Sequence, residues 1–378
     1  MRIPFNKPFI IGKELEYIAE AIDSGRSAGD GPYSRKCQSF IENRFEAGQT
    51  LLTTSCTAAL EMTAILGNIG KGDEVILPSY TFVSTANAFA MRGAHVRFVD
   101  IRPDTLNIDE TLIGDAITDK TKAIVPVHYA GVGCEMDTIL SVAKANELLV
   151  IEDAAQGVNA RYKGRYLGTL GDMATFSFHE TKNFICGEGG ALVTNNPEYS
   201  ERAEIIREKG TNRSQFFRGE IDKYTWVDIG SSYLPSDLLA AFLYAQLEHL
   251  EEITQRRKDI YLQYERLLKP LEENGLLRMP RVPETCSTNY HMFYILLEDE
   301  KTRAALIAHL RERNIHAVFH YVPLHLSPVG RSMGYSEGQL PITENLSERL
   351  LRLPFYFELT ADQVSRIVEE IHAFYGVG

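Results

Sequence analysis

The strongest constraint on the fold is an alternation, between residues 50 and 195, of short apolar runs with stretches of helical periodicity. Several of the apolar runs have no polar side, as expected for strands that are covered on both faces. The expected strands are 74–78, 95–100, 122–127, 148–153, 174–178 and 191–194. Helical patterns lie between them, for example at 83–92 and 136–147. This alternation predicts an α/β fold: a mostly parallel central sheet with helices on both faces.

The sequence after residue 235 has a different pattern. Residues 236 to about 270 predict one long helix, which Ser236 caps and Pro270 ends. We then expect strands and helices in alternation, at 289–298, 301–314, 315–322 and 361–375. Because a chain of 378 residues exceeds what one core usually supports, we expect a large domain at 1–250 and a smaller C-terminal α+β domain at 251–378.

The charge of the chain restricts its partners. Lys and Arg total 39 against 51 Asp and Glu, a net charge of −12, so neither nucleic acid nor an anionic membrane is an expected partner. We find no apolar run long enough to span a bilayer and no signal-peptide core. The five cysteines are widely spaced and form no CxxC pair, which favours reduced thiols and a cytoplasmic protein without a metal site. An anionic substrate would therefore need local positive charge.

Two candidate catalytic residues lie at predicted strand ends. Asp153 ends the strand 148–153, where open α/β sheets bind ligands, although a carboxylate there can equally cap the next turn. Lys182 lies in the loop after 174–178 and is either a solvated lysine or an amine that forms a Schiff base. The glycine-rich stretch GEGGALV that follows indicates a close approach of the backbone to another group.

Two further segments have features of a site for a phosphate and a flat ring. TTSCTAALEM (53–62) begins a helix, and a helix N-terminus is either a phosphate site or an ordinary Ser/Thr cap. PSYTFVST (78–85) places Tyr80 and Phe82 at a strand end, as core residues or as a plate for a flat ring. A phosphate site, an aromatic plate, an acid and a lysine are together what pyridoxal phosphate requires of a protein.

The chain resembles the sugar aminotransferases of fold type I, which use pyridoxal phosphate. The motifs EDAAQ, SFHETKN and GEGG carry this resemblance, within similar stretches from residue 78 to 234. The resemblance implies that Lys182 binds the cofactor covalently, that Asp153 pairs with the pyridine nitrogen, and that Gln156 contacts the ring or its 3-hydroxyl. It also implies contacts to the cofactor phosphate and ring from Cys56, Thr57, Ser177 and Phe82.

The resemblance further implies a homodimer with active sites near the subunit interface, and amino transfer from L-glutamate to a dTDP-linked ketosugar. Many relatives contribute an Asn from a G-x-N-Y segment to the partner's phosphate site, where this chain has Ser232. Arg213 and Lys223 belong to a basic segment that we expect to reach the nucleotide sugar, unless it is simply solvated. The candidates for the sugar site, for which packing or capping is the alternative, are His320, Tyr321 and His325.

Three alternatives differ in reaction or substrate. The same chemistry on another nucleotide-linked ketosugar, or with a gluco product, would use the same residues. A regulator that binds pyridoxal phosphate without catalysis would retain them as well. The sugar dehydratase branch of the family carries His in place of the lysine, so Lys182 argues against a dehydratase.

Overall fold

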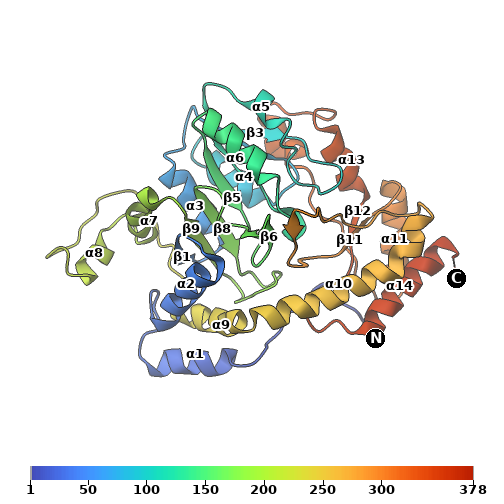
Figure 1. The fold of residues 1–378 in the computed structure, drawn as a ribbon, viewed down its shortest axis with the longest axis horizontal. Coiled ribbons are helices and arrows are strands. Elements are labelled where there is room, and N and C mark those ends of the chain that lie inside the picture. Colours follow the sequence, from blue (N-terminus) through green and yellow to red (C-terminus); the bar gives the residue numbers. More distant parts are fainter. Residues whose placement is uncertain (1, 378) are drawn as a thin grey trace.

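A seven-stranded sheet forms the centre of the molecule in the computed structural model, which describes residues 2–377 (Figure 1). Its strands are β1 (Gln49–Thr53), β2 (Glu74–Pro78), β3 (His95–Val99), β4 (Thr121–Ile124), β5 (Leu149–Asp153), β8 (Met173–Ser177) and β9 (Gly190–Thr194). They lie in the order β1-β9-β8-β5-β4-β2-β3, and only β9 runs against its neighbours. The predicted mostly parallel sheet is confirmed, and each of the six expected strands overlaps an observed one. The strand β1 was not predicted.

Helices cover both faces of the sheet, as predicted. One face packs against α2 (Pro32–Phe45) and α9 (Asp237–Glu248) near β1, β8 and β9, and against α6 (Met136–Ala145) near β4 and β5. The other face packs against α3 (Cys56–Leu66), α4 (Val83–Ala90) and α7 (Ser200–Arg207). Neighbouring residues of β1 illustrate the arrangement, because Leu51 faces the second layer and Leu52 the first.

The predicted long helix is two helices. α9 ends at Glu248, and α10 (Leu250–Glu273) continues after a kink at His249. Ser236 caps α9 as predicted, because its side chain accepts the N–H of Leu239. Pro270 does not end α10 but lies inside its last two turns, so the predicted end was wrong. A proline so close to the C-terminal end of a helix removes one helical hydrogen bond, and the last turn of the helix still forms.

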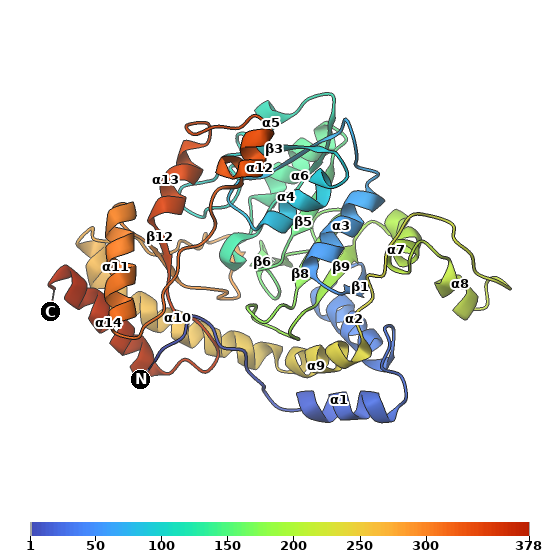
Figure 2. The ribbon, with the colours of Figure 1, turned by 180° about the vertical axis from the view of Figure 1, so that it is seen from behind.

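The C-terminal part packs around its own apolar cluster. α10 lies there against α14 (Ala361–Tyr375) and α11 (Glu300–Glu312) next to a two-stranded sheet of β11 (Tyr294–Leu296) and β12 (Leu350–Arg352) (Figure 2). The helices predicted at 301–314 and 361–375 are confirmed. The strand predicted at 315–322 was wrong, since this stretch pairs only through isolated bridges at Ile315 and Val318. The domain division near 250 stays a prediction.

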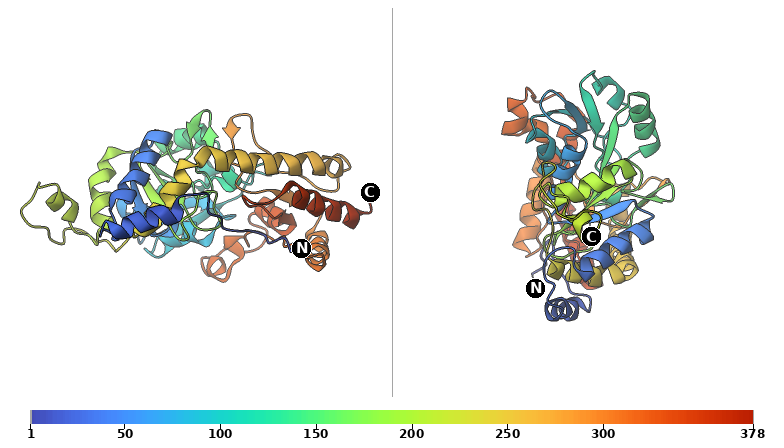
Figure 3. Two further views of the ribbon diagram at one scale, coloured as in Figure 1. Left: turned by 90° about the horizontal axis from the view of Figure 1, so that it is seen from below. Right: turned by 90° about the vertical axis from the view of Figure 1, so that its left-hand side faces the viewer.

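The remaining α-helices and β-strands are short or peripheral. They are α1 (Glu14–Asp23), α5 (Ile113–Ala116), α8 (Arg213–Phe217), α12 (Pro328–Ser332), α13 (Pro341–Arg349), β6 (Arg161–Tyr162), β7 (Arg165–Tyr166) and β10 (Cys286–Ser287). Residues 208–232, which include α8 and are called the arm below, extend away from the body of the molecule (Figure 3). None of the described helices combines the length and apolar character needed to cross a membrane.

Candidate active site

The parallel strands β5 and β8 bring Asp153 and Ser177 to the same edge of the sheet. Asp153 is only 4% exposed, and its Oδ2 accepts a hydrogen bond from the Thr85 hydroxyl at 2.7 Å. Its Oδ1 accepts the N–H of Ala155 at 3.1 Å. Asp153 therefore caps the following turn and is also a buried carboxylate at the strand end. The capping role and the ligand-binding role expected from the sequence are compatible.

Lys182 lies in the loop that leaves β8. It lines a cavity together with Ser177, Gln156, Asn183 and His291. Burial lowers the pKa of the Lys182 amine, and the charge of the nearby Asp153 carboxylate only partly offsets this. A larger fraction of the amine is therefore neutral, which is the form that attacks a carbonyl carbon.

The N-terminus of α3 lies next to this cavity. Ser55 caps the helix by accepting the N–H of Ala58 at 3.0 Å, and the Thr57 hydroxyl lies 2.8 Å from the Ser84 hydroxyl. The first N–H groups of a helix have no partner within the helix. A Cβ at Gly190 would overlap the backbone of Ser55 and Cys56, so the glycine-rich stretch approaches α3 closely.

Cys56, the first residue of α3, carries a protonated thiol. Burial raises its pKa to about 12, and the charge of Asp153 adds to the effect. The start of α3 therefore presents hydroxyl, thiol and N–H groups and no negative charge.

Gln156 connects the cavity to the segment around residue 320. Its Oε1 accepts the N–H of Ala130 at 2.7 Å, and its Nε2 donates to the Tyr321 hydroxyl at 3.0 Å. The Tyr321 ring stacks on His320 with 3.6 Å between centroids, and His320 Nδ1 lies 2.6 Å from the Tyr129 hydroxyl. The structure thus brings His320 and Tyr321 to the edge of the candidate site.

The aromatic residues at the end of β2 have different environments. Phe82 is 57% exposed, and its ring lies 6.3 Å from that of Tyr321. Tyr80 is buried and packs against Tyr129 at 5.3 Å between centroids. Phe82 is therefore available for a ring, whereas Tyr80 is a core residue.

Asn183, Asn289 and His291 were missed by sequence reasoning. The Asn183 side chain donates to the Asn289 carbonyl at 2.8 Å and lies 2.9 Å from His291 Nδ1. Asn289 in turn donates to the backbone carbonyls of Gln156 and Val158. These contacts join segments more than 100 residues apart, so the only signal in the sequence was that Asn183 follows Lys182.

His325 lies outside this group. Its Nδ1 lies 2.7 Å from the Ser79 hydroxyl and its Nε2 lies 3.0 Å from Glu344 Oε1. Both ring nitrogens are therefore used in holding the start of α13 to the end of β2.

The arm keeps three other candidates away from Lys182 within this chain. The Arg213 guanidinium lies over the Phe217 ring, 4.9 Å from its centroid, and 3.7 Å from Glu208. Lys223 is exposed, and Ser232 is exposed and bridges Glu208. Figure 1 shows the arm on the side of the molecule opposite the C-terminal part.

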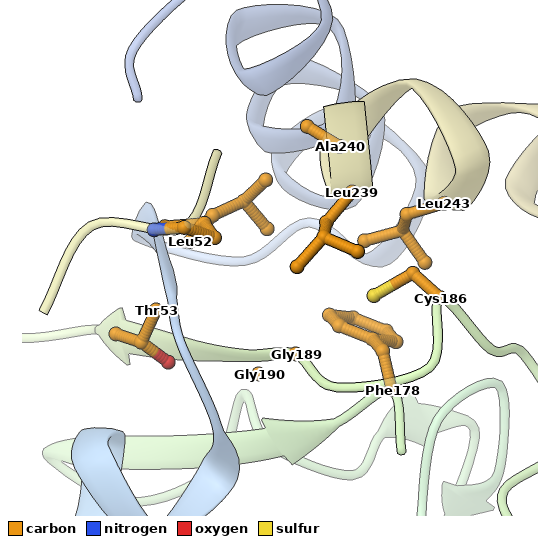
Figure 4. Close-up of a pocket in the computed structure, with 10 residues that line it drawn as sticks. Leu52, Thr53, Phe178, Cys186, Gly189, Gly190, Leu239, Ala240 and Leu243 are labelled. Atoms are coloured by element: carbon orange, nitrogen blue, oxygen red, sulfur yellow. The ribbon is translucent and has the colours of Figure 1, made fainter. Parts of the chain in front are cut away.

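A second pocket lies behind the glycine-rich loop (Figure 4). Its lining is mostly apolar, and includes Leu52, Phe178, Leu239, Leu243 and Cys186. This composition is typical of a packing defect between the loop and α9, not of a ligand site with convergent polar groups.

Comparison with known proteins decides the family. The sequence profile of the DegT/DnrJ/EryC1/StrS aminotransferase family matches residues 8–372. The chain belongs to this family. The spore coat polysaccharide biosynthesis protein SpsC of Bacillus subtilis is 33% identical over 98% of this chain and 96% of its own.

Solved structures agree with this membership. The structure of this chain superposes on that of the aminotransferase TlmJ from Streptoalloteichus hindustanus with a TM-score of 0.91 and 30% sequence identity. The match covers 100% of this chain and 99% of TlmJ. The PLP form of Spr1654 from Streptococcus pneumoniae, described as a sugar aminotransferase, gives 0.92 and 26%, covering 100% and 99%. Spr1654 is also known in a PMP form. The protein is therefore a member of an aminotransferase family with the fold type I architecture, and its relative Spr1654 has been solved with pyridoxal phosphate and with its amino form.

The residues at the edge of the sheet fit this cofactor. A partly buried amine and a buried carboxylate lie in one group at Lys182 and Asp153. The first turn of α3 and Ser177 offer donors for a phosphate, and Gly190 leaves room beside them because it lacks a Cβ.

Proposed function

We propose that the enzyme transfers the amino group of L-glutamate to the 4-keto carbon of dTDP-4-keto-6-deoxy-D-glucose. The products are then dTDP-4-amino-4,6-dideoxy-D-galactose and 2-oxoglutarate. The observation that carries amino transfer is that the Lys182 amine, which lines the cavity, lies close enough to the buried Asp153 carboxylate for its charge to raise the pKa of the amine. The specific sugar rests on the similarity of residues 207–234 to the transaminase that makes this product.

Lys182 and Asp153 perform the proton chemistry in this proposal. Pyridoxal phosphate supplies an electron sink for the charge left when a proton leaves the donor Cα, and it carries the amino group between the two substrates. Lys182 Nζ would take that proton from the donor Cα and return it to the carbon on the other side of the amino nitrogen, as base and then as acid. Asp153, oriented by the Thr85 hydroxyl, keeps the ring nitrogen protonated. Such a contact pair at about 4 Å contributes on the order of 4 kcal/mol at an effective dielectric of 20.

The start of α3 holds the cofactor phosphate. The helix N-terminus attracts a dianion, and the hydroxyls of Thr57 and Ser177 supply further donors. Cys56 contributes without repulsion because its thiol stays protonated. Gln156 then contacts the cofactor ring from its polar side. Phe82 contacts the ring from the side that is open to solvent.

The nucleotide sugar binds with help from the arm of a second subunit. The chain is acidic overall, so a diphosphate needs local cations, and Arg213 and Lys223 lie on the arm. Trp226 beside them is 74% exposed, and an aromatic residue so exposed is typical of a surface that another molecule covers. We propose a homodimer in which Ser232 approaches the partner's phosphate site, while His320 and Tyr321 contact the sugar.

The absorbance spectrum of the purified holoprotein tests the proposal. L-glutamate should abolish the yellow absorbance, and the dTDP-linked ketosugar should restore it. If glutamate abolishes the yellow absorbance and the dTDP-linked ketosugar does not restore it, another ketosugar is the substrate. If the absorbance does not respond to glutamate, a non-catalytic regulator is favoured. The configuration of the product at C4, determined by NMR, distinguishes the galacto from the gluco sugar. The same assay on cell fractions would test the cytoplasmic location that we propose.

A further inference from the structure

Arg207, the last residue of α7, is a buried cation at the point where the chain enters the arm. Its side chain is 3% exposed, and its Nη2 donates to both carboxylate oxygens of Asp30, at 2.8 and 2.7 Å. Its Nη1 donates to Gln38 Oε1 at 3.1 Å and to the carbonyl of Leu52 in β1 at 3.3 Å. Charge-assisted hydrogen bonds are stronger and more directional than neutral ones, so these contacts fix the start of the arm against the large sheet.

The residues just after the arm pack against the same loop, 27–31. A Cβ at Gly29 would lie 2.6 Å from the Leu234 side chain, so only a glycine permits this approach. The N–H of Asp237, the first residue of α9, donates to the carbonyl of Ser27 at 3.0 Å. The loop therefore contacts the chain where it enters the arm and again where it leaves.

The two ends of the arm are also joined to each other. The N–H of Lys209 donates to the carbonyl of Ser231 at 3.0 Å, and the N–H of Tyr233 donates to the carbonyl of Arg207 at 3.2 Å. Because its ends are paired, the arm moves as one unit about this base. A change of direction at Arg207 is therefore carried to the far part of the arm (Figure 3).

The backbone of Asp30 indicates that its carboxylate matters. Its φ is +58°, a left-handed conformation in which a glycine is unstrained and most other residues are not. Backbone strain of this kind is found where a side chain has a function. What Asp30 adds over glycine at this position is the carboxylate that holds Arg207.

A second ion pair at the arm is more exposed. Arg202 of α7 donates to Asp228 at 2.7 Å, and these side chains are 30% and 26% exposed. A pair that water reaches contributes little to the energy of a contact. Arg207 is different, because a buried cation that loses its counter-ion is strongly destabilised in that position. The direction of the arm therefore depends more on Asp30 than on Asp228.

We propose that Asp30 is a positioning residue for the nucleotide sugar, because it fixes, through Arg207, the direction in which the arm leaves its subunit. The inference rests on the proposed function, in which the arm brings Arg213 and Lys223 to the diphosphate at the second active site. Groups that bind a substrate act only when they are held in place. Asp30 bonds to arginines and has no hydrogen bond to Lys182 among the described residues, so the glutamate step should not depend on it.

The fluorescence of Trp226 tests the position of the arm without any substrate. Trp226 is the only tryptophan of the chain and lies on the arm. In Asp30→Asn, which keeps the size of the side chain and removes its charge, acrylamide should quench Trp226 more strongly and its anisotropy should fall. Asp104→Asn is the matched control, because Asp104 also accepts two hydrogen bonds from one arginine, Arg102, in the segment after β3. Equal Trp226 signals in Asp30→Asn and the control overturn the inference.

The two half-reactions of the holoprotein separate positioning from a general loss of structure. In Asp30→Asn, the KM for the dTDP-linked ketosugar should rise about 10-fold, whereas the response to L-glutamate should change less than about threefold. Asp228→Asn should give a smaller rise in KM. An unchanged KM in Asp30→Asn overturns the inference, and so does an equal loss of both half-reactions.

Arg207→Lys provides a second variant, since it keeps the charge and loses the planar group that contacts both oxygens of Asp30. If Asp30→Asn does not fold, an unchanged Trp226 signal and KM in Arg207→Lys overturn the inference. A wild-type protein that responds to neither glutamate nor the ketosugar contradicts the proposed function instead. The Trp226 comparison still tests in that case whether Asp30 holds the arm.

Discussion

At the scale of single residues, the site depends on buried carboxylates whose oxygens accept hydrogen bonds. Asp153 is held by one hydroxyl and one backbone N–H. Its neighbour Glu152 points to the other face of β5, where it is fully buried. Neighbouring residues of a strand point to opposite sides. The end of β5 therefore places the candidate catalytic carboxylate of Asp153 on one side and the structural carboxylate of Glu152 on the other.

Replacing Asp153 by Asn should remove most of the activity without unfolding the protein. The amide keeps the size of the side chain and loses the charge that keeps the ring nitrogen protonated. We expect kcat to fall by at least about 100-fold, with weaker cofactor binding and an unchanged circular dichroism spectrum. Turnover near that of the wild type would contradict the role assigned to Asp153.

Glu152 should make stability depend on pH. Burial raises the pKa of its carboxyl, but the hydrogen bonds from His128 and from the N–H groups of Gly171 and Gly168 outweigh burial, and the pKa lies below its ordinary value. Because the pKa is lower in the folded state, this stabilisation is present above the unfolded pKa and is lost as pH falls through the folded one.

Urea unfolding at several pH values measures this contribution. Glu152→Gln should lower the free energy of unfolding by about 2–4 kcal/mol at pH 7. The loss of stability as the pH falls from the ordinary carboxyl pKa of 4.5 to lower values should be smaller in the variant than in the wild type. Parallel curves for the two proteins would show that Glu152 is not the titrating group.

At the scale of elements, the contact between β9 and α3 shapes the proposed phosphate site. Gly190 is the first residue of β9, and a Cβ there would meet backbone atoms, which cannot move aside as a flexible side chain can. The strand and the helix start therefore touch only because this position is glycine.

Gly190→Ala should destabilise the protein and weaken the binding of pyridoxal phosphate together. We expect a loss of about 1–3 kcal/mol, measured by thermal unfolding, and a higher dissociation constant for the cofactor, measured by absorbance titration. Gly114→Ala on α5 is the control, because a Cβ there meets no atom within 4 Å. Equal cofactor affinity in both variants would contradict the proposed position of the phosphate.

At the scale of the whole molecule, the arm is the feature that a single chain does not explain. Phe217 and Trp226 are 68% and 74% exposed on a segment that leaves the body (Figure 3). Apolar groups exposed in this way are expected to be buried by another molecule. In the proposed homodimer, the same segment brings Arg213 and Lys223 to the second active site.

Changing both aromatic residues to Ser should therefore weaken the dimer and the sugar half-reaction together. Sedimentation velocity over a range of concentrations measures the first effect, and the KM for the ketosugar measures the second. The glutamate half-reaction should change little. Leu262→Ser, on the exposed side of α10, is the control for loss of an exposed apolar residue. A stable dimer with an unchanged KM would exclude this role of the arm.

What the sequence determined by itself was local. Apolar runs predict the parallel strands, and their ends place Asp153, Ser177 and Lys182 at one edge, because parallel strands share a direction. The packing of α3 against GEGG was foreseen only as a close approach to some group. Ser236 and the helix at 361–375 were predicted correctly, since caps and helical periodicity act within a few residues.

Only the tertiary structure decided which distant residues meet. Asn289 and His291 join Asn183 across more than 100 residues, and Arg352 lies beside the segment of His320 through backbone bonds that no local pattern encodes. Residues 315–322 look like a strand by composition, yet they pair only at isolated positions and carry the candidate residues His320 and Tyr321. Hydrophobic periodicity records how a segment is covered, whereas the partners of polar side chains depend on how separate segments pack.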